Sequence, residues 1–210
     1  MIAGAILAAG QSARFGATPK QLAELCGRPL LDHAIAAMAA VPSVDRTLVI
    51  LGASATEILA RVDFLNAEAI ICSEWREGQS ASLRTAVTRL EADCQAVVVT
   101  LGDQPCISPR AIARVVQAAS GSPAAVVRAT YSGTPVHPVL LRRELFGKIC
   151  ALRGDQGARE LFGAAAVLDV DCTGLGSPDD VDRLDDLAAL RARLSGLVTP
   201  QDPRSPGSGA

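Results

Sequence analysis

Six short apolar runs, separated by segments of helical periodicity, constrain the fold of this chain more than any other feature. The runs are rich in Val, Ile, Leu and Ala, and none alternates strictly with polar residues, as a strand with one face in water would. This pattern is typical of a parallel sheet that helices cover on both faces. The sequence therefore predicts an α/β fold, with strands at residues 2–7, 46–51, 67–72, 96–101, 124–130 and 166–170.

Helices are expected between these strands. They are predicted to begin at residues that suit a first helical turn or cap it, namely Pro29, Ser54, Ser80, Pro109, Asp155 and Pro178. No internal repeat and no Gly- or Pro-rich linker divides residues 1–198, so we expect one domain there. Residues 199–210 (TPQDPRSPGSGA) have almost no apolar side chains to bury, and we expect a disordered tail.

Composition excludes several classes of protein. The chain has 210 residues, 49% of them hydrophobic, which is enough to bury one sizeable core. Its formal charge of −2 is spread along the sequence, which argues against a nucleic acid partner. No segment approaches the roughly 18 apolar residues of a membrane span, and the apolar start lacks the charged region of a signal peptide. We therefore expect a soluble, cytoplasmic protein that has no membrane partner.

A loop of small residues follows the first predicted strand and reads LAAGQSARFG over residues 7–16. In α/β folds phosphates bind at this position, because small residues let backbone N–H groups approach a triphosphate. Arg14 and Lys20 can supply positive charge as charge separates in the reaction. The alternative is a glycine-rich turn with two solvated cations. The pattern is neither GxGxxG nor the Walker sequence, which argues against a dinucleotide dehydrogenase or a P-loop ATPase. The nucleotide-binding residues predicted here are Leu7, Ala8, Ala9, Gly10, Ser12, Arg14 and Lys20.

Asp103 is the best candidate for a metal ligand. It follows the apolar strand predicted at residues 96–101, so its carboxylate should lie at the same sheet edge as the small-residue loop. Mg²⁺ prefers one or two carboxylates together with phosphate oxygens, which an Asp at this edge would satisfy. Alternatively, the Asp-Gln-Pro sequence is only a turn that ends the strand.

The two segments together resemble a known family. The pattern LAAGxSxRFGxxPKQL is similar to the signature of the nucleotidyltransferase superfamily that includes the molybdenum cofactor cytidylyltransferases, and the LxDQP element around Asp103 is similar as well. The resemblance implies a three-layer α/β/α, Rossmann-like fold with a mostly parallel sheet, and a catalytic metal held by Asp103. It also implies that the GxxxSL segment reads the base through Gly78, Ser80 and Ser82. From the residues alone, Ser80 is equally a helix N-cap.

Two further segments, GTPVHPVL at 133–140 and RGDQGAR at 153–159, resemble the family's acceptor-binding motifs. The resemblance implies acceptor contacts from His137, Pro138, Gly154, Asp155 and Arg159. A lone histidine is more often structural, and Arg159 could equally form a surface ion pair.

One motif departs from the family pattern. Members usually carry D-[IV]-D-[TS]-P-[ED]-D, whose first two aspartates help to hold the metal, but here Gly174 and Gly176 stand in their places. Asp171 lies nearby in a strand and could substitute as a metal ligand. Alternatively, Asp171 caps a loop, or Asp103 binds the metal with water and phosphates alone, or the chemistry has been lost.

The resemblance implies that the chain uses Mg²⁺ to transfer CMP from CTP to a molybdopterin-type cofactor, releasing pyrophosphate, with Arg14, Lys20 and Asp103 as catalytic residues. A molybdenum hydroxylase apoenzyme would then receive the product. Three alternatives stay open. The first is a nucleotidyltransferase that uses another nucleotide or transfers to a sugar phosphate. The second is a carrier or chaperone that binds the cofactor without turnover, and the third is an oxidoreductase on the same scaffold.

Overall fold

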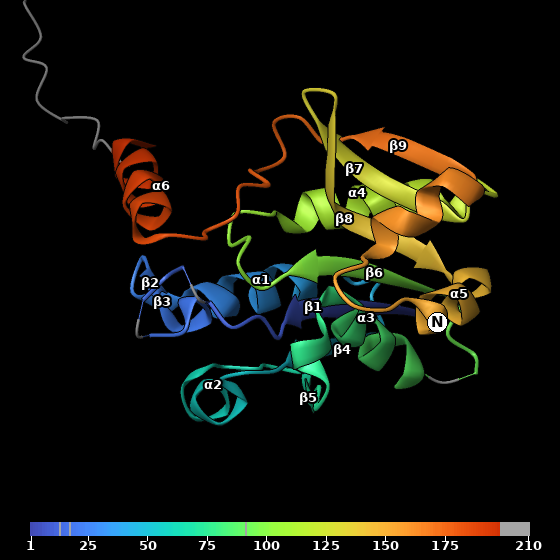
Figure 1. Ribbon diagram of the computed structural model, residues 1–210. Helices are drawn as coiled ribbons and strands as arrows, with labels where there is room; N and C mark the ends of the chain where they lie inside the picture. The colour runs from blue at the N-terminus through green and yellow to red at the C-terminus, as the bar shows by residue number, and fades with distance from the viewer. Residues whose placement is uncertain (13, 17, 91, 198–210) are drawn as a thin grey trace, which may run out of the picture.

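A seven-stranded sheet forms the centre of the protein in the computed structural model, which describes residues 1–12, 14–16, 18–90 and 92–197 (Figure 1). The strand order is β5-β4-β1-β6-β8-β7-β9, and β8 alone among them runs antiparallel to its neighbours. The strands are β1 (Ile2–Ala8), β4 (Arg46–Leu51), β5 (Glu68–Ile71), β6 (Ala96–Leu101), β7 (Val126–Tyr131), β8 (Thr134–Arg142) and β9 (Val167–Asp171). A two-stranded sheet, β2 (Glu24–Leu25) and β3 (Arg28–Pro29), lies apart from it.

Helices cover both faces of this sheet. The helices are α1 (Leu30–Ala39), α2 (Ala55–Arg61), α3 (Gln79–Thr88), α4 (Pro109–Ser120), α5 (Phe146–Ala151) and α6 (Leu184–Leu197). Alternate strand residues point to opposite faces, so Val49 and Leu51 pack with α1, α2 and α4, whereas Leu48 and Ile50 pack with α3 and α5. Short 3₁₀ helices are η1 (Lys20–Leu22), η2 (Trp75–Glu77), η3 (Arg143–Leu145) and η4 (Ala158–Ala164). The prediction of a three-layer α/β fold with a mostly parallel sheet is confirmed.

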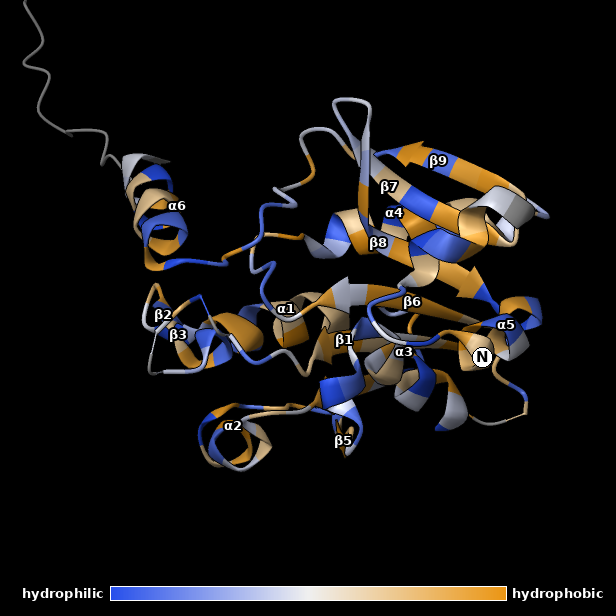
Figure 2. Ribbon diagram, in the orientation of Figure 1, coloured by the Kyte–Doolittle hydropathy of each residue, from blue (hydrophilic) through white to orange (hydrophobic). Residues whose placement is uncertain are grey.

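The central strands β1 and β6 are almost wholly apolar, as the hydropathy colouring shows (Figure 2). Both faces of these strands are buried under helices, which explains why their sequences lack alternation. No helix within the described ranges is long and apolar enough to cross a membrane.

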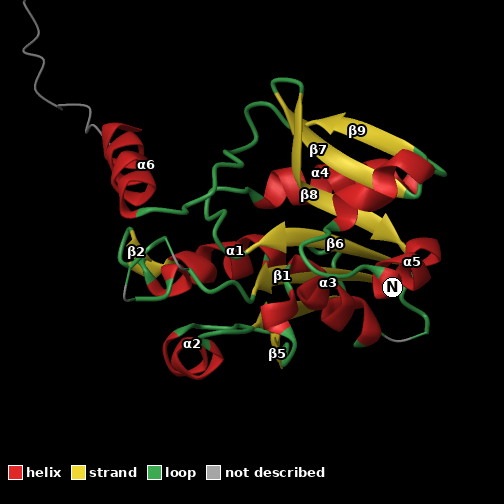
Figure 3. Ribbon diagram, in the orientation of Figure 1, coloured by secondary structure: helices red, strands yellow, loops and turns green. Residues whose placement is uncertain are grey.

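Two predicted helix starts are wrong. The segment after Asp155 forms the 3₁₀ helix η4 from Ala158, and the last helix begins at Leu184 rather than at Pro178. Residues 177–183 instead have no regular secondary structure and pass over the loop after β6, where the Val181 N–H donates to the Asp103 carbonyl at 2.9 Å. Figure 3 shows this loop between the sheet and α6. The predicted tail, residues 199–210, lies outside the described residues.

Candidate active site

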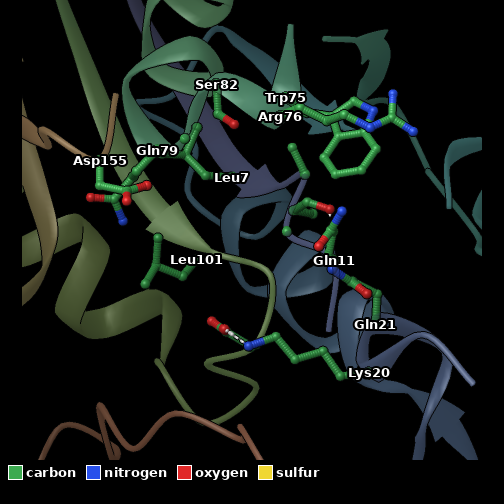
Figure 4. Close-up of a pocket in the computed structure, with 15 residues that line it drawn as sticks. Leu7, Gln11, Lys20, Gln21, Trp75, Arg76, Gln79, Ser82, Leu101 and Asp155 are labelled. Atoms are coloured by element: carbon green, nitrogen blue, oxygen red, sulfur yellow. Dashed lines mark hydrogen bonds and ion pairs between the residues drawn. The ribbon is translucent and has the colours of Figure 1, made fainter. Parts of the chain in front are cut away.

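A cavity of about 550 Å³ opens at the carboxyl ends of β1 and β6, where parallel strands of α/β sheets place their ligand sites (Figure 4). It collects residues from the small-residue loop, η1, η2, the start of α3 and the loop before η4. Its lining comprises Leu7, Ala8, Ala9, Gly10, Gln11, Lys20, Gln21, Trp75, Arg76, Gly78, Gln79, Ser82, Leu101, Asp103 and Asp155. The cavity thus contains most of the residues predicted to bind the nucleotide.

Lys20 forms the charged centre of this cavity. Its ammonium donates to Oδ2 of Asp103 and, at 2.7 Å, to Oδ1 of Asp182. Burial alone would lower the pKa of Lys20, but the charge of Asp103 and the hydrogen bonds that Lys20 donates to both carboxylates outweigh burial and raise it. The hydrogen bond from Lys20 in turn lowers the pKa of Asp182. Lys20 is therefore a fixed cation at neutral pH, positioned to meet phosphate oxygens.

Asp103 has an oxygen that the protein leaves unsatisfied. Its Oδ1 is buried and has no hydrogen-bond partner among the described residues, whereas Oδ2 is occupied by Lys20. A buried carboxylate oxygen without a partner is costly, and a hard cation would satisfy it. Among the described residues no cluster of three or more His, Cys, Asp or Glu side chains could hold a metal. The site therefore fits a cation that takes its remaining ligands from phosphate and water.

Ser12 and Arg14 lie outside the lining of this cavity, although both were predicted to bind nucleotide. The Ser12 hydroxyl accepts from the Lys20 backbone N–H and donates to the Gln21 side chain, both at 3.1 Å. Ser12 therefore fastens the loop to η1. Arg14 is 66% exposed and pairs with Asp182 at 2.8 Å, so it holds the same carboxylate as Lys20 from the solvent side.

Of the three residues predicted to read the base, two line the cavity and one does not. Gly78 and Ser82 line the cavity, whereas Ser80 is completely buried and its hydroxyl donates to the Gly154 carbonyl at 2.8 Å. The prediction that Ser80 contacts the nucleotide is therefore wrong, because its polar groups join α3 to the loop before η4. Gly78 has a φ of 109°, and a Cβ there would lie 2.4 Å from the Asp155 carboxylate and 2.6 Å from the Gly154 carbonyl carbon. Only glycine fits this contact.

A second cavity of about 380 Å³ adjoins the first and shares with it Leu7, Gln79, Leu101 and Asp155. Two of the other predicted acceptor residues, His137 and Arg159, line it. Pro138 and Gly154 do not; Pro138 is buried within β8, and Gly154 supports Ser80. The residues predicted for the nucleotide and those predicted for the acceptor therefore lie mainly in two different cavities that adjoin each other.

The second cavity is lined by polar and apolar groups in similar measure. Burial lowers the pKa of His137 to about 4, a shift that Asp103 opposes and Arg159 reinforces, so the imidazole is neutral at neutral pH. Arg128 lies over the Phe162 ring, 5.3 Å from its centre, and pairs with Asp169. Arg159 has neither a hydrogen bond nor an ion pair with any described residue, which leaves its charge available to an anionic ligand.

Asp171 does not belong to the site. It ends the edge strand β9, three strands away from β6, a separation of roughly 14 Å at the usual strand spacing. Its exposed carboxylate accepts from the Thr173 N–H at 2.9 Å and from the Thr173 hydroxyl at 2.6 Å. The prediction that Asp171 replaces the missing metal ligand is therefore wrong, and the alternative that it caps a loop is what the structure shows.

The acidic residues near Lys20 come instead from the segment after Pro178, which sequence reasoning missed. Asp182 contacts Lys20 directly, and Asp180 lines the second cavity. Burial, followed by the nearby charge of Asp103, raises the pKa of Asp180. The sequence signal was the acidic run DDVD at 179–182, which was interpreted as the start of a helix.

These features together define an α/β enzyme that binds a nucleotide next to another substrate. They are the cavity at the carboxyl ends of parallel strands, the small-residue loop, the lysine paired with a carboxylate, and the second cavity alongside. Comparison with known proteins gives the family. The model of the MobA-like NTP transferase domain matches residues 4–169, and the chain belongs to this family of nucleotidyltransferases.

Individual relatives differ in what they are named for. The chain is 27% identical over 204 residues to nicotine blue oxidoreductase of Paenarthrobacter nicotinovorans, covering 90% of this chain and 96% of that protein. It is 35% identical over 147 residues to 2-C-methyl-D-erythritol 4-phosphate cytidylyltransferase of Cereibacter sphaeroides, covering 68% and 62% respectively. A crystal structure of an Rv0371c homologue from Mycobacterium sp. strain JC1 superposes with a TM-score of 0.81 at 33% identity, covering 93% of this chain and 98% of that one.

Proposed function

We propose that this protein is a Mg²⁺-dependent cytidylyltransferase that transfers CMP from CTP to a molybdopterin-type cofactor and releases pyrophosphate. The observation that supports this most directly is the pair of adjoining cavities, with Lys20 and the unsatisfied Asp103 oxygen in the first and Arg159, whose side chain has no ion-pair partner among the described residues, in the second. A transfer between two substrates needs both to be held with their reacting atoms adjacent.

Each part of the first cavity has a distinct task in this proposal. The backbone of Leu7 to Gly10 and the Lys20 ammonium bind the triphosphate and stabilise the charge that develops as pyrophosphate leaves. Mg²⁺ held by Asp103, when bound, supplies further neutralisation of phosphate charge. Gly78 and Ser82 lie against the nucleoside.

The second cavity binds the acceptor. Its terminal phosphate is already an anion, so no general base is required for attack on the α-phosphorus. That fits the chemistry of His137, which is neutral and a weak base with a pKa of about 4. Arg159 attracts the acceptor phosphate, and Asp155, which lines both cavities, separates the two substrates. The proposal includes a cytoplasmic location and a molybdenum hydroxylase apoenzyme as recipient of the product. It also treats residues 1–198 as one catalytic domain.

The test is pyrophosphate release by the purified protein with Mg²⁺ and molybdopterin, using CTP, GTP, ATP and UTP in turn. Release with CTP alone supports the proposal. Release with another nucleotide would keep the reaction class and replace the base. Absence of release with every nucleotide, in a protein that demonstrably binds the cofactor, would favour the carrier alternative.

Two relatives favour specific alternatives for the substrate. The Cereibacter relative suggests a sugar-type phosphate as acceptor, which replacement of molybdopterin by 2-C-methyl-D-erythritol 4-phosphate in the same assay would reveal. The Paenarthrobacter relative suggests a redox reaction on this scaffold. Loss of NAD(P)H absorbance with a quinone-like substrate, in the absence of any nucleoside triphosphate, would support that second function.

A further inference from the structure

One end of the first cavity is formed by a stacked pair of side chains, Trp75 and Arg76. Both line the first cavity and neither lines the second. The Arg76 guanidinium carbon lies 4.3 Å from the centre of the Trp75 ring, and Arg76 forms no hydrogen bond or ion pair with the described residues. Trp75 is half-buried and packs against the apolar cluster beneath α3, and it is the chain's single tryptophan. The stacked pair therefore gives the cavity a planar, partly apolar and cationic wall.

The backbone that carries this pair is held in place by Arg84. Glu74 and Glu77 flank the pair in sequence, and Arg84 from α3 pairs with them at 3.0 and 2.6 Å. The same guanidinium donates to the Leu152 carbonyl at 2.9 Å. The turn is therefore tied to α3 and to the chain beyond α5, so the planar wall exists before a ligand binds. Preorganisation of this kind lowers the entropic cost of binding.

The residues on the other sides of the first cavity indicate which part of a nucleotide would face Trp75 and Arg76. In Figure 4, Lys20 and its ion pair lie at the bottom, Gln79 and Asp155 lie on one side, and Trp75 and Arg76 lie on the other. Gln79 and Asp155 also line the second cavity, so the acceptor lies on their side. Lys20 fixes the end where phosphates bind. The part of a nucleoside triphosphate that would face the Trp75 and Arg76 wall is its planar base.

We propose that the Trp75 and Arg76 pair is the platform on which the nucleotide base stacks. This inference rests on the proposed function, because it assumes that the cavity binds a nucleoside triphosphate. Aromatic rings and guanidinium planes both stack on bases, and stacking tolerates every base because each has a π face. The pair therefore sets affinity for the base in general, while the polar groups of Gly78 and Ser82 discriminate between bases.

Because the chain has one tryptophan, its fluorescence reports directly on this wall. Titration of the full chain with CTP in the presence of Mg²⁺ should quench the tryptophan emission. The Kd fitted to the quenching curve should equal the Kd that calorimetry gives. Inorganic triphosphate, which has no base, should bind without quenching. CTP binding that leaves the emission unchanged would overturn the inference, while the proposed function would stand. Absence of CTP binding in calorimetry would overturn both.

Variants separate stacking from charge. Trp75→Ala should weaken binding of all four nucleotides about tenfold, which is within the range for loss of one stacked base. Trp75→Phe keeps an aromatic ring, so its affinity for the nucleotides should stay within about threefold of wild type. Arg76→Lys keeps the charge but loses the plane, so it should weaken CTP binding as much as Arg76→Ala does. Neither change at Arg76 should alter the affinity for inorganic triphosphate. Arg61→Ala, at an exposed pair on α2, is the matched control and should change nothing.

Two outcomes would contradict the stacking role. If Arg76→Lys binds CTP as the wild type does while Arg76→Ala weakens both CTP and inorganic triphosphate, Arg76 acts as a charge on the phosphates. If Trp75→Ala is folded by circular dichroism and keeps wild-type affinity for every nucleotide, the base lies elsewhere. Should Trp75→Ala not fold, the two Arg76 variants and the fluorescence titration of the wild type still decide the matter, because they leave the buried part of the wall in place.

Discussion

Asp103→Asn tests the centre of the site, because it changes a charge and almost no volume. In the folded protein, Lys20 would lose one of two carboxylate partners but keep Asp182 at 2.7 Å. Lys20 and Asp103 are 12% and 17% exposed, so the lost interaction is worth more than a surface ion pair but does not strand the lysine. We expect the free energy of unfolding to fall by about 1–2 kcal/mol. For a chain of this size that lowers Tm by roughly 2–8 °C.

The effect on turnover should be much larger than the effect on folding. The amide would present one oxygen without the negative charge that a hard cation prefers, so transition-state stabilisation at the phosphates is lost. Removal of one electrostatic contribution of this kind typically costs about 10²- to 10³-fold in rate. The assay is pyrophosphate release at saturating CTP and acceptor, with Mg²⁺ varied. Rate and Tm are measured on the same preparation.

Asp171→Asn is the matched control, since it makes the same chemical change at an exposed carboxylate on β9. Its turnover and Mg²⁺ dependence should stay within about twofold of wild type. The reasoning would be refuted if the folded Asp103→Asn protein released pyrophosphate at the wild-type rate. An equal loss of turnover in the two variants would show instead that Asp171 acts in the site.

Three other predictions concern positions where the structure leaves little freedom. Gly78→Ala should destabilise the protein by about 2–4 kcal/mol and reduce turnover, because the added carbon would meet the Asp155 carboxylate and the backbone beside it; denaturant unfolding and the release assay check both effects. Gly176→Asp, which restores a family aspartate, should lower Tm rather than raise activity, because its Cβ would lie 2.5 Å from the Cys106 carbonyl oxygen at a φ of 110°. The pKa of His137 is lowered to about 4 by folding, so the unfolded chain takes up this proton first and wild-type stability should fall as the pH drops from about 6.5 to 4. His137→Gln should flatten that part of the stability profile, measured by urea unfolding at pH 4.5 and 7.5; an unchanged profile would contradict the lowered pKa of His137.

Most of the sheet could be predicted because its strands are continuous apolar runs. The six predicted strands are all present, with bounds that shift by two residues or fewer. The strand that was missed, β8, carries Pro135, His137 and Pro138 in its first half, and prolines in a strand remove ladder hydrogen bonds. Its position between β6 and β7 is set by tertiary pairing, including a register shift after Arg128, and no local pattern records this.

The site was predictable where it depends on strand ends and not where it depends on distant contacts. Lys20 and Asp103 follow β1 and β6, and adjacent parallel strands bring their carboxyl ends together. Asp182 meets Lys20 across 162 positions, after the chain has left β9 and returned over the loop that follows β6. Ser80 was misassigned for a similar reason, since the partner of its hydroxyl lies 74 positions away.

Gly176, one of the two glycines that replace the family's aspartates, has a local explanation. Residue 176 pairs with Ile107 in an isolated bridge, and the Ser177 N–H donates to the Cys106 carbonyl at 3.0 Å, so the backbone passes close to the loop that follows β6. A side chain at 176 has no room in that contact. The same close approach carries the chain onward so that Asp182 reaches Lys20. The loss of both motif aspartates therefore does not remove acidic groups from the site, and it gives no independent reason to regard the protein as a carrier without turnover.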